Sequence, residues 1–241
     1  MQDGQKIMST KNSSVVFGTE DILRSLCNSV TKVLTAATQS QIRYSGMVQR
    51  ITKTCLKPDI GCFVLFDGGF SGLVVINFSA ASAMELYQSY MLSMSMAKDE
   101  LASSHTSDEV SNVMGELMNQ IVGDFTSTVA RELQTHITQS QPKMLALHKQ
   151  VMLSVDTNLD QPESRRVTFF TGSNNIFYLE LAIDRTEFIK LNDFETQQAP
   201  DPDELIAQAS AASASAVAAP AATPRPADLT EQDDFLKSLG M

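Results

Sequence analysis

The sequence has few of the features that mark membrane, secreted and metal-binding proteins. No apolar run approaches the roughly 18 residues of a membrane-spanning helix, and the first 16 residues are too polar for a signal peptide. The chain has only three cysteines, Cys27, Cys55 and Cys62, an odd number without the spacing of metal ligands. This usage is typical of buried thiols in a reducing compartment, so we expect a cytoplasmic protein.

Signatures of common catalytic sites are missing as well. His105, His136 and His148 are too widely spaced to form an H-x-x-x-H pair, so no metal site is predicted. The sequence contains no G-x-S-x-G loop and no Walker-type phosphate loop. Lys and Arg number 18 against 28 acids, and the net charge of -10 argues against binding to nucleic acid or to an anionic membrane. A protein partner is the remaining expectation.

Composition divides the chain into four parts. Of the 241 residues 43% are apolar, which is enough for a sizeable core. We expect a flexible N-terminal arm over 1–16 and a folded domain over 17–191. The stretch 192–227 is rich in Ala, Ser and Pro, and its small side chains bury too little surface to offset chain entropy, so it is predicted to be a disordered linker. Residues 228–241 are predicted to form an amphipathic helix.

A pattern of apolar strands occurs twice in the sequence. Phe63-Val-Leu-Phe-Asp-Gly68 aligns with Val167-Thr-Phe-Phe-Thr-Gly172, and each segment leads through a turn into a second strand. Strand-like stretches at 42–56 and 144–155 precede these hairpins. Helices are predicted from Thr19, read as an N-cap, and over 79–92 and 107–136. We therefore expect an α+β fold of two helix-strand-strand-strand repeats that share one sheet, with one extra helix between them.

The predicted helix over 107–136 has two contrasting faces. Asn112, Glu116, Asn119 and Gly123 fall within about 60° of one another, because spacings of three and four residues stack along a helix. Apolar residues with helical periodicity form the opposite, buried arc: Val110, Val113, Met114, Leu117, Met118, Ile121, Phe125 and Val129.

Two interpretations of the polar face stay open at this point. It is either an ordinary surface face of mediocre helix propensity or a flat face that enters a cleft of another molecule. In the second case an Asn carboxamide can orient a water for in-line attack. A Glu one turn away can pair with a Lys of the partner.

Glu116-Leu-Met-Asn119, followed after 22 residues by Pro142, resembles the active-site signature of the CheC, CheX and FliY chemotaxis phosphatases. Asn112 departs from the signature, which has Asp or Ser there. The resemblance extends over about residues 17–189 and implies a CheC/CheX-like fold that dephosphorylates the aspartyl phosphate of a CheY-like receiver domain. It implies that Asn119 positions the attacking water and that Glu116 forms a salt bridge with the receiver's Lys. Asn112, Gly123 and Pro142 then have supporting roles.

The first helix carries a degenerate version of the same motif. Asp21, Ser25 and Asn28 stand at the family spacing, but Ser25 replaces the Glu and no Pro follows at the expected distance. We therefore expect one active face, with Asn28 as a remote candidate.

The end of the chain has a second resemblance, to the C-terminal receiver-docking peptide of the chemotaxis phosphatase CheZ. Thr230 is a plausible N-cap, and the helix that follows is acidic on one face and apolar on the other. The alternative is a disordered tail that happens to end amphipathically. The resemblance implies that the receiver docks on Asp233, Asp234, Phe235, Leu236 and Leu239.

These expectations define the partners and their alternatives. No cofactor of the protein's own is expected, since the resemblance implies that the phosphorylated receiver supplies Mg²⁺. Relatives of the CheX type imply a homodimer. A non-catalytic receiver-binding adaptor or flagellar-switch component is the second hypothesis. A small-ligand sensor is the third, although the sequence offers no convergent polar cluster for a ligand.

Overall fold

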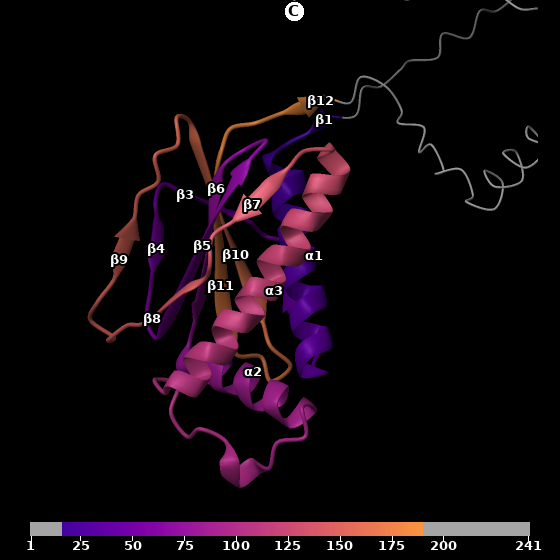
Figure 1. The fold of residues 1–241 in the computed structure, drawn as a ribbon. Coiled ribbons are helices and arrows are strands. Elements are labelled where there is room, and N and C mark those ends of the chain that lie inside the picture. The colour runs from indigo at the N-terminus through magenta and orange to yellow at the C-terminus, as the bar shows by residue number, and fades with distance from the viewer. Residues whose placement is uncertain (1–15, 190–241) are drawn as a thin grey trace, which may run out of the picture. The chain divides into compact units, whose positions relative to one another are not determined.

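The computed structural model describes residues 16–189, which form three layers (Figure 1). Two long helices, α1 (Thr19–Thr38) and α3 (Asp108–Leu133), lie side by side on one face of a central antiparallel sheet. A small sheet of β4 (Thr54–Leu56) and β9 (Leu153–Val155) lies on the other side. The shorter helix α2 (Ala80–Ser93) packs against α1 and α3 at one end.

The other elements belong to the central sheet or to its margins. β1 (Val16–Phe17) pairs with β12 (Phe188–Ile189), and a short 3₁₀ turn, η1 (Lys98–Glu100), separates α2 from α3. Among the described residues, eight strands make the central sheet: β2 (Arg43–Tyr44), β3 (Gln49–Ile51), β5 (Ile60–Gly68), β6 (Gly72–Phe78), β7 (Ile137–Gln139), β8 (Lys143–Ala146), β10 (Pro162–Phe170) and β11 (Ile176–Asp184).

The two repeats exchange their outer strands. The sheet order is β2-β10-β11-β6-β5-β7, with β3 also on β10 and β8 also on β5. Thus β2 and β3 of the first repeat pair with the second repeat, while β7 and β8 of the second pair with the first. The hairpins β5–β6 and β10–β11 meet at the centre through β6 and β11. The prediction of two repeats in one sheet is confirmed, and the exchange of strands is an addition to it.

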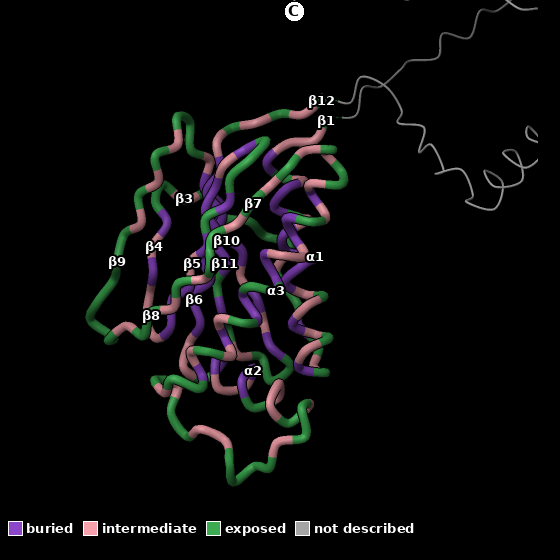
Figure 2. The backbone as a smooth tube through the Cα atoms, viewed as in Figure 1, coloured by how far each residue is buried: buried purple, intermediate pink, exposed green. Residues whose placement is uncertain are grey.

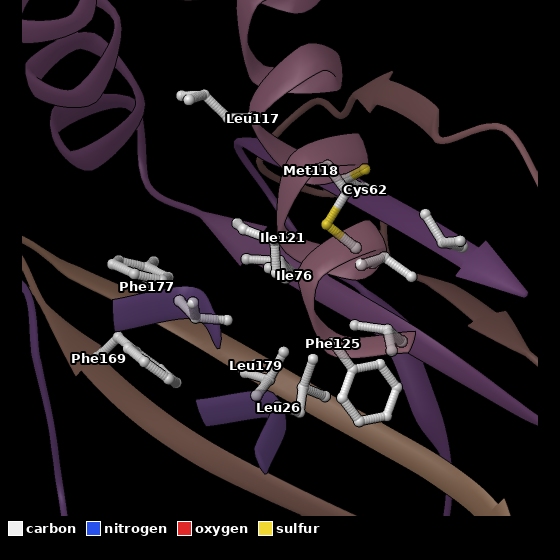
Figure 3. Close-up of a cluster of buried hydrophobic side chains, with 14 of the residues drawn as sticks. Leu26, Cys62, Ile76, Leu117, Met118, Ile121, Phe125, Phe169, Phe177 and Leu179 are labelled. Carbon is white, nitrogen blue, oxygen red and sulfur yellow. The ribbon is translucent and has the colours of Figure 1, made fainter. Parts of the chain in front are cut away.

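The main core lies between the central sheet and the helices. Figure 3 places Leu117, Met118, Ile121 and Phe125 of α3 among side chains from the sheet and from α1. The predicted buried arc of α3 is confirmed except at Val113, which is half-buried, and Val122 and Thr126 are buried in addition. Burying this arc holds α3 in place, and its other face is left at the surface.

The helix ends differ slightly from the prediction. Helix α3 begins at Asp108, because the Ser107 side chain accepts a hydrogen bond from the Val110 N–H (3.3 Å), and it ends at Leu133 before the left-handed residue Gln134. Thr19 is the first residue of α1 and not its N-cap, which corrects the prediction. Gly18 is the cap residue, and its N–H donates to the Asp21 carboxylate (3.1 Å).

The second face of the sheet carries a smaller core under β4 and β9. Buried polar groups attach β4 there: the Cys55 N–H donates to Glu180 (2.9 Å), and the Lys57 N–H donates to Asn77 (2.7 Å). Arg166 neutralises the fully buried Glu180 at 2.8 Å. The prediction of one continuous strand over 42–56 and another over 144–155 is therefore wrong. The first stretch divides into β2 and β3 of the central sheet and β4 on the second face, and the second divides into β8 of the central sheet and β9 on the second face.

Two of the three cysteines are buried as expected, and Cys55 is half-buried. Burial raises the pKa of the Cys27 thiol to about 12 and also raises that of Cys62, so both stay protonated at neutral pH. The predicted linker and C-terminal helix lie outside the described residues. The predicted N-terminal arm also lies outside them, except for Val16.

Candidate functional site

Helix α3 carries Asn112, Glu116 and Asn119 along one exposed face. The three residues span about two helical turns and stack one above another. Figure 2 shows how exposed and buried positions alternate along this helix. Gly123 continues the face one turn further; it is half-buried, and an added Cβ would meet no atom within 4 Å. The helix surface at Gly123 is therefore not covered by a neighbouring side chain.

The carboxamide of Asn119 is held from the neighbouring strand. Gln139, the last residue of β7, donates a hydrogen bond from Nε2 to Asn119 Oδ1 at 3.0 Å. The Thr126 hydroxyl lies 3.3 Å from both Gln139 Oε1 and the Gly123 carbonyl oxygen, so the two acceptors share its one hydrogen, and Thr126 is only 6% exposed. Within residues 16–189, Asn119 Nδ2 has no acceptor from the protein. The oxygen of the carboxamide faces the protein, and its two N–H donors are available to a ligand.

Backbone pairing fixes the position of Gln139. It lies opposite the buried Phe66 in the β5–β7 pairing, so its side chain is on the helix-facing side of the sheet. The next residue, Ser140, donates from its N–H to Leu65 O (2.8 Å) and accepts from the Leu65 N–H through its hydroxyl (3.1 Å). Pro142 is half-buried in the turn between β7 and β8, three residues after Gln139.

Glu116 is exposed and bonded only along its own helix. Gln120 Nε2 donates to Glu116 Oε1 at 2.9 Å. In the part of the chain that the structure describes, Glu116 has no cationic partner. A cation from another molecule can therefore approach its second oxygen from solvent.

The first repeat contains a matching arrangement without the carboxylate. Asn28 of α1 accepts a hydrogen bond at Oδ1 from the Tyr44 hydroxyl (3.2 Å), and Tyr44 belongs to β2, the first strand after α1. Ser25 occupies the Glu position and is half-buried. Asp21 is used at the helix start, where it accepts from Gly18 N–H and from Arg24 (3.1 Å each). In each repeat, an exposed Asn on the long helix is thus hydrogen-bonded to the strand that follows the helix. Within the described residues, only the second repeat also has a Glu at the motif position without a cationic partner.

A polar groove lies between α1 and α3, beside Asn28. It has a volume of about 430 Å³, and neither Glu116 nor Asn119 lines it. Asp124 crosses it, accepting from Ser29 (2.8 Å) and pairing with Lys32. Partial burial would raise the pKa of Asp124, but the hydrogen bonds from Lys32 and Ser29 outweigh this effect and lower it. The groove is thus closed in part by internal bonds between the helices.

Two further site types are absent from residues 16–189. No group of three or more His, Cys, Asp or Glu side chains there is arranged to hold a metal ion. None of the helices in that range combines the length and apolarity that crossing a bilayer requires.

The comparison with protein families identifies a relationship along nearly the whole chain. The family model described as "Protein of unknown function (DUF3334)" matches residues 13–241. The chain belongs to this DUF3334 family. No curated protein matches it.

Solved structures show that this DUF3334 protein has the CheC/CheX-like fold, as predicted. The chemotaxis protein CheX from Desulfovibrio desulfuricans is 16% identical, with a TM-score of 0.56 over 68% of this chain and 99% of that chain. A CheC-like superfamily protein from Shewanella sp. PV-4 is 16% identical, with a TM-score of 0.56 over 68% and 97%. CheX from Vibrio vulnificus is 13% identical, with a TM-score of 0.54 over 68% and 99%. At these identities the likeness establishes the fold, and activity has to be argued from the site.

The site differs from the sequence prediction in what supports Asn119. Gln139 and Thr126 were not predicted, because Thr138-Gln-Ser140 reads as an ordinary polar end of a strand. Glu116 and Asn119 share a face with Asn112, as predicted from their spacing. Five further residues, predicted to dock the partner, lie outside the described residues: Asp233, Asp234, Phe235, Leu236 and Leu239.

Proposed function

We propose that this chain is a phosphatase that hydrolyses the aspartyl phosphate of a CheY-like receiver domain. The observation that supports the proposal is the exposed pair Glu116 and Asn119 on one face of α3, with the Asn119 carboxamide bonded to Gln139. The CheC/CheX-like fold provides the setting for this pair. On an ordinary solvent-exposed helix face, by contrast, both side chains would rotate freely.

Docking of the receiver follows from the charges on this face. Glu116 offers a carboxylate oxygen to a Lys of the receiver, and this ion pair gains strength when the interface excludes water. The small residue Gly123 lets the partner approach the helix closely. The receiver contributes its own Mg²⁺, which neutralises charge on the phosphoryl group.

The chemical step needs positioning and no covalent intermediate on this chain. A water held by Asn119 attacks phosphorus in line with the aspartyl oxygen, and the phosphorus–oxygen bond to the receiver breaks. Its electron pair goes to the receiver's carboxylate, and the protons of the water leave with inorganic phosphate and to solvent. Because an aspartyl phosphate is already reactive, orienting the water can supply the catalytic effect without a general base from this chain.

The test measures the decay of a phosphorylated CheY-like receiver from the same cell. Wild type should accelerate the decay, and Asn119→Ala should lose on the order of 100-fold of that acceleration, because the water is no longer positioned. Glu116→Gln should mainly raise the receiver concentration needed for half-maximal rate. Asn28→Ala is the matched control, since it removes the equivalent amide from the repeat without a carboxylate.

Two outcomes would contradict the proposal. Equal losses in Asn28→Ala and Asn119→Ala would mean that the second repeat has no special role. Binding of the receiver without any change in its decay would favour the adaptor hypothesis.

A further inference from the structure

The hydrogen bond from Gln139 to Asn119 has a consequence for the chemistry of the site. We infer that Gln139 is the positioning residue of the reaction, which holds Asn119 with Oδ1 toward the protein and Nδ2 toward the receiver. This inference rests on the proposed phosphatase function and assigns a role to a residue outside the helix that carries Glu116 and Asn119.

Gln139 is itself restrained by its neighbours. Its backbone belongs to β7, which is paired with β5 at Phe66, and Ser140 adds two hydrogen bonds to Leu65. Its Oε1 shares the hydroxyl hydrogen of Thr126, which is buried in α3, with the Gly123 carbonyl oxygen. A donor on a fixed backbone can determine the orientation of a neighbouring carboxamide, because the free rotation of an exposed Asn is lost.

The other repeat contains an equivalent hydrogen bond between its long helix and its first outer strand. Tyr44 on β2 donates to Asn28 Oδ1 at 3.2 Å, in the place that Gln139 on β7 takes beside Asn119. Both bonds join the long helix of a repeat to its first outer strand. In both cases the strand provides the donor and the Asn oxygen accepts. The arrangement thus belongs to the architecture of the repeat, and the second repeat adds Glu116 to it.

The orientation decides which atoms the receiver meets. With Oδ1 engaged by Gln139, the two hydrogens on Asn119 Nδ2 can donate to an oxygen of the attacking water or of the phosphoryl group. A water that accepts one such bond keeps its second lone pair for phosphorus. Reversing the carboxamide would instead present an acceptor oxygen, which repels the phosphoryl oxygens and can hold the water only through one of its hydrogens.

Two substitutions test the inference. Gln139→Met keeps the length of the side chain and removes the donor. It should lower kcat for receiver dephosphorylation about tenfold with KM within about twofold, as expected when the Asn119 carboxamide loses the hydrogen bond that orients it for the reaction. Gln139→Glu accepts from Asn119 Nδ2 and reverses the carboxamide, so it should lose at least as much. Tyr44→Phe, which removes the equivalent bond in the first repeat, should retain the wild-type kcat.

A second readout does not depend on activity. The ¹H–¹⁵N heteronuclear NOE of the Asn119 side-chain amide, assigned by its absence in Asn119→Ala, should be high in wild type and fall in Gln139→Met. If wild type has no phosphatase activity, the proposed function fails, while this signal still decides whether Gln139 restrains Asn119. An unchanged kcat and NOE in Gln139→Met would overturn the positioning role. A wild-type kcat in Gln139→Glu would overturn the stated orientation.

Discussion

Gly68 is a residue whose backbone alone determines what can occupy its position. Its φ of +155° is rare for side chains other than glycine, and an added Cβ would lie 2.0 Å from the His136 carbonyl oxygen. The contact is with backbone, so no side-chain rotation can relieve it. Gly68 thereby lets the end of β5 meet the start of β7, the strand that carries Gln139.

Gly68→Ala should therefore lower the free energy of unfolding by about 2–3 kcal/mol. Urea titration followed by circular dichroism measures this change. Gly46→Ala is the matched control, because a Cβ there meets no atom within 4 Å. Equal effects in the two variants would show that the close approach at Gly68 does not constrain the protein.

At the same scale, the sequence reveals the residues proposed to act, Glu116 and Asn119, better than the residue that holds one of them in place. Glu116 and Asn119 can be placed on one face because helical spacing is a local property. Gln139 follows Asn119 by 20 residues, and its place beside Asn119 depends on the register of β7 against β5. Register is set by pairing between distant segments, so no local pattern marks Gln139.

At the scale of elements, α1 and α3 are joined by Asp124, which accepts from Ser29 and Lys32. Folding lowers the pKa of Asp124 from 3.8. The bonds therefore stabilise the folded protein fully at pH values above the pKa of the unfolded chain, and this stabilisation is lost as the pH falls through the lower pKa of the folded protein. Lys32 is largely exposed, which limits the contribution of the ion pair.

Asp124→Asn should cost about 1 kcal/mol of unfolding free energy at pH 7. The difference between wild type and variant should shrink toward pH 3, because below 3.8 the unfolded chain takes up a proton at Asp124 that the folded protein does not. Denaturant titrations at the two pH values measure it. A difference that does not depend on pH would mean that the charge of Asp124 is not what joins the helices.

Elements that depend on local contacts were predicted from the sequence, and elements that depend on distant contacts were not. Helices α1, α2 and α3 and the hairpins β5–β6 and β10–β11 follow from periodicity and turn residues. The outer strands β2, β3, β7 and β8 are two to four residues long and pair with the opposite repeat. A segment so short carries little signal of its own, and its partner lies far away in the sequence.

At the scale of the whole molecule, the proposed function assigns capture of the receiver to the predicted docking segment over 228–241 and chemistry to the folded domain. A tethered binding site raises the local concentration of its ligand toward the millimolar range when the linker spans the distance. In the proposed reaction, Glu116 and Asn119 act without any atom of that segment.

A chain ending at Asp193 should therefore keep its kcat and need on the order of 10–100-fold more receiver for half-maximal rate. The decay of the phosphorylated receiver over a range of concentrations of the shortened and full chains measures both values. Leu236→Ala combined with Leu239→Ala in the full chain should reproduce the truncation. Unchanged receiver dependence in both proteins would exclude docking by these residues.

The exchange of outer strands between the repeats also affects how the chain folds as it is made. Arg43 in β2 bonds to Asn174, 131 residues later, and within residues 16–189 the strands β2 and β3 both pair with β10. On the ribosome the first repeat emerges with its outer strands unpaired, because β10 has not yet been synthesised. Contacts of such long sequence separation make folding slow and leave strand edges open in the meantime. The nascent chain must keep its first half from aggregating until most of the domain has left the exit tunnel.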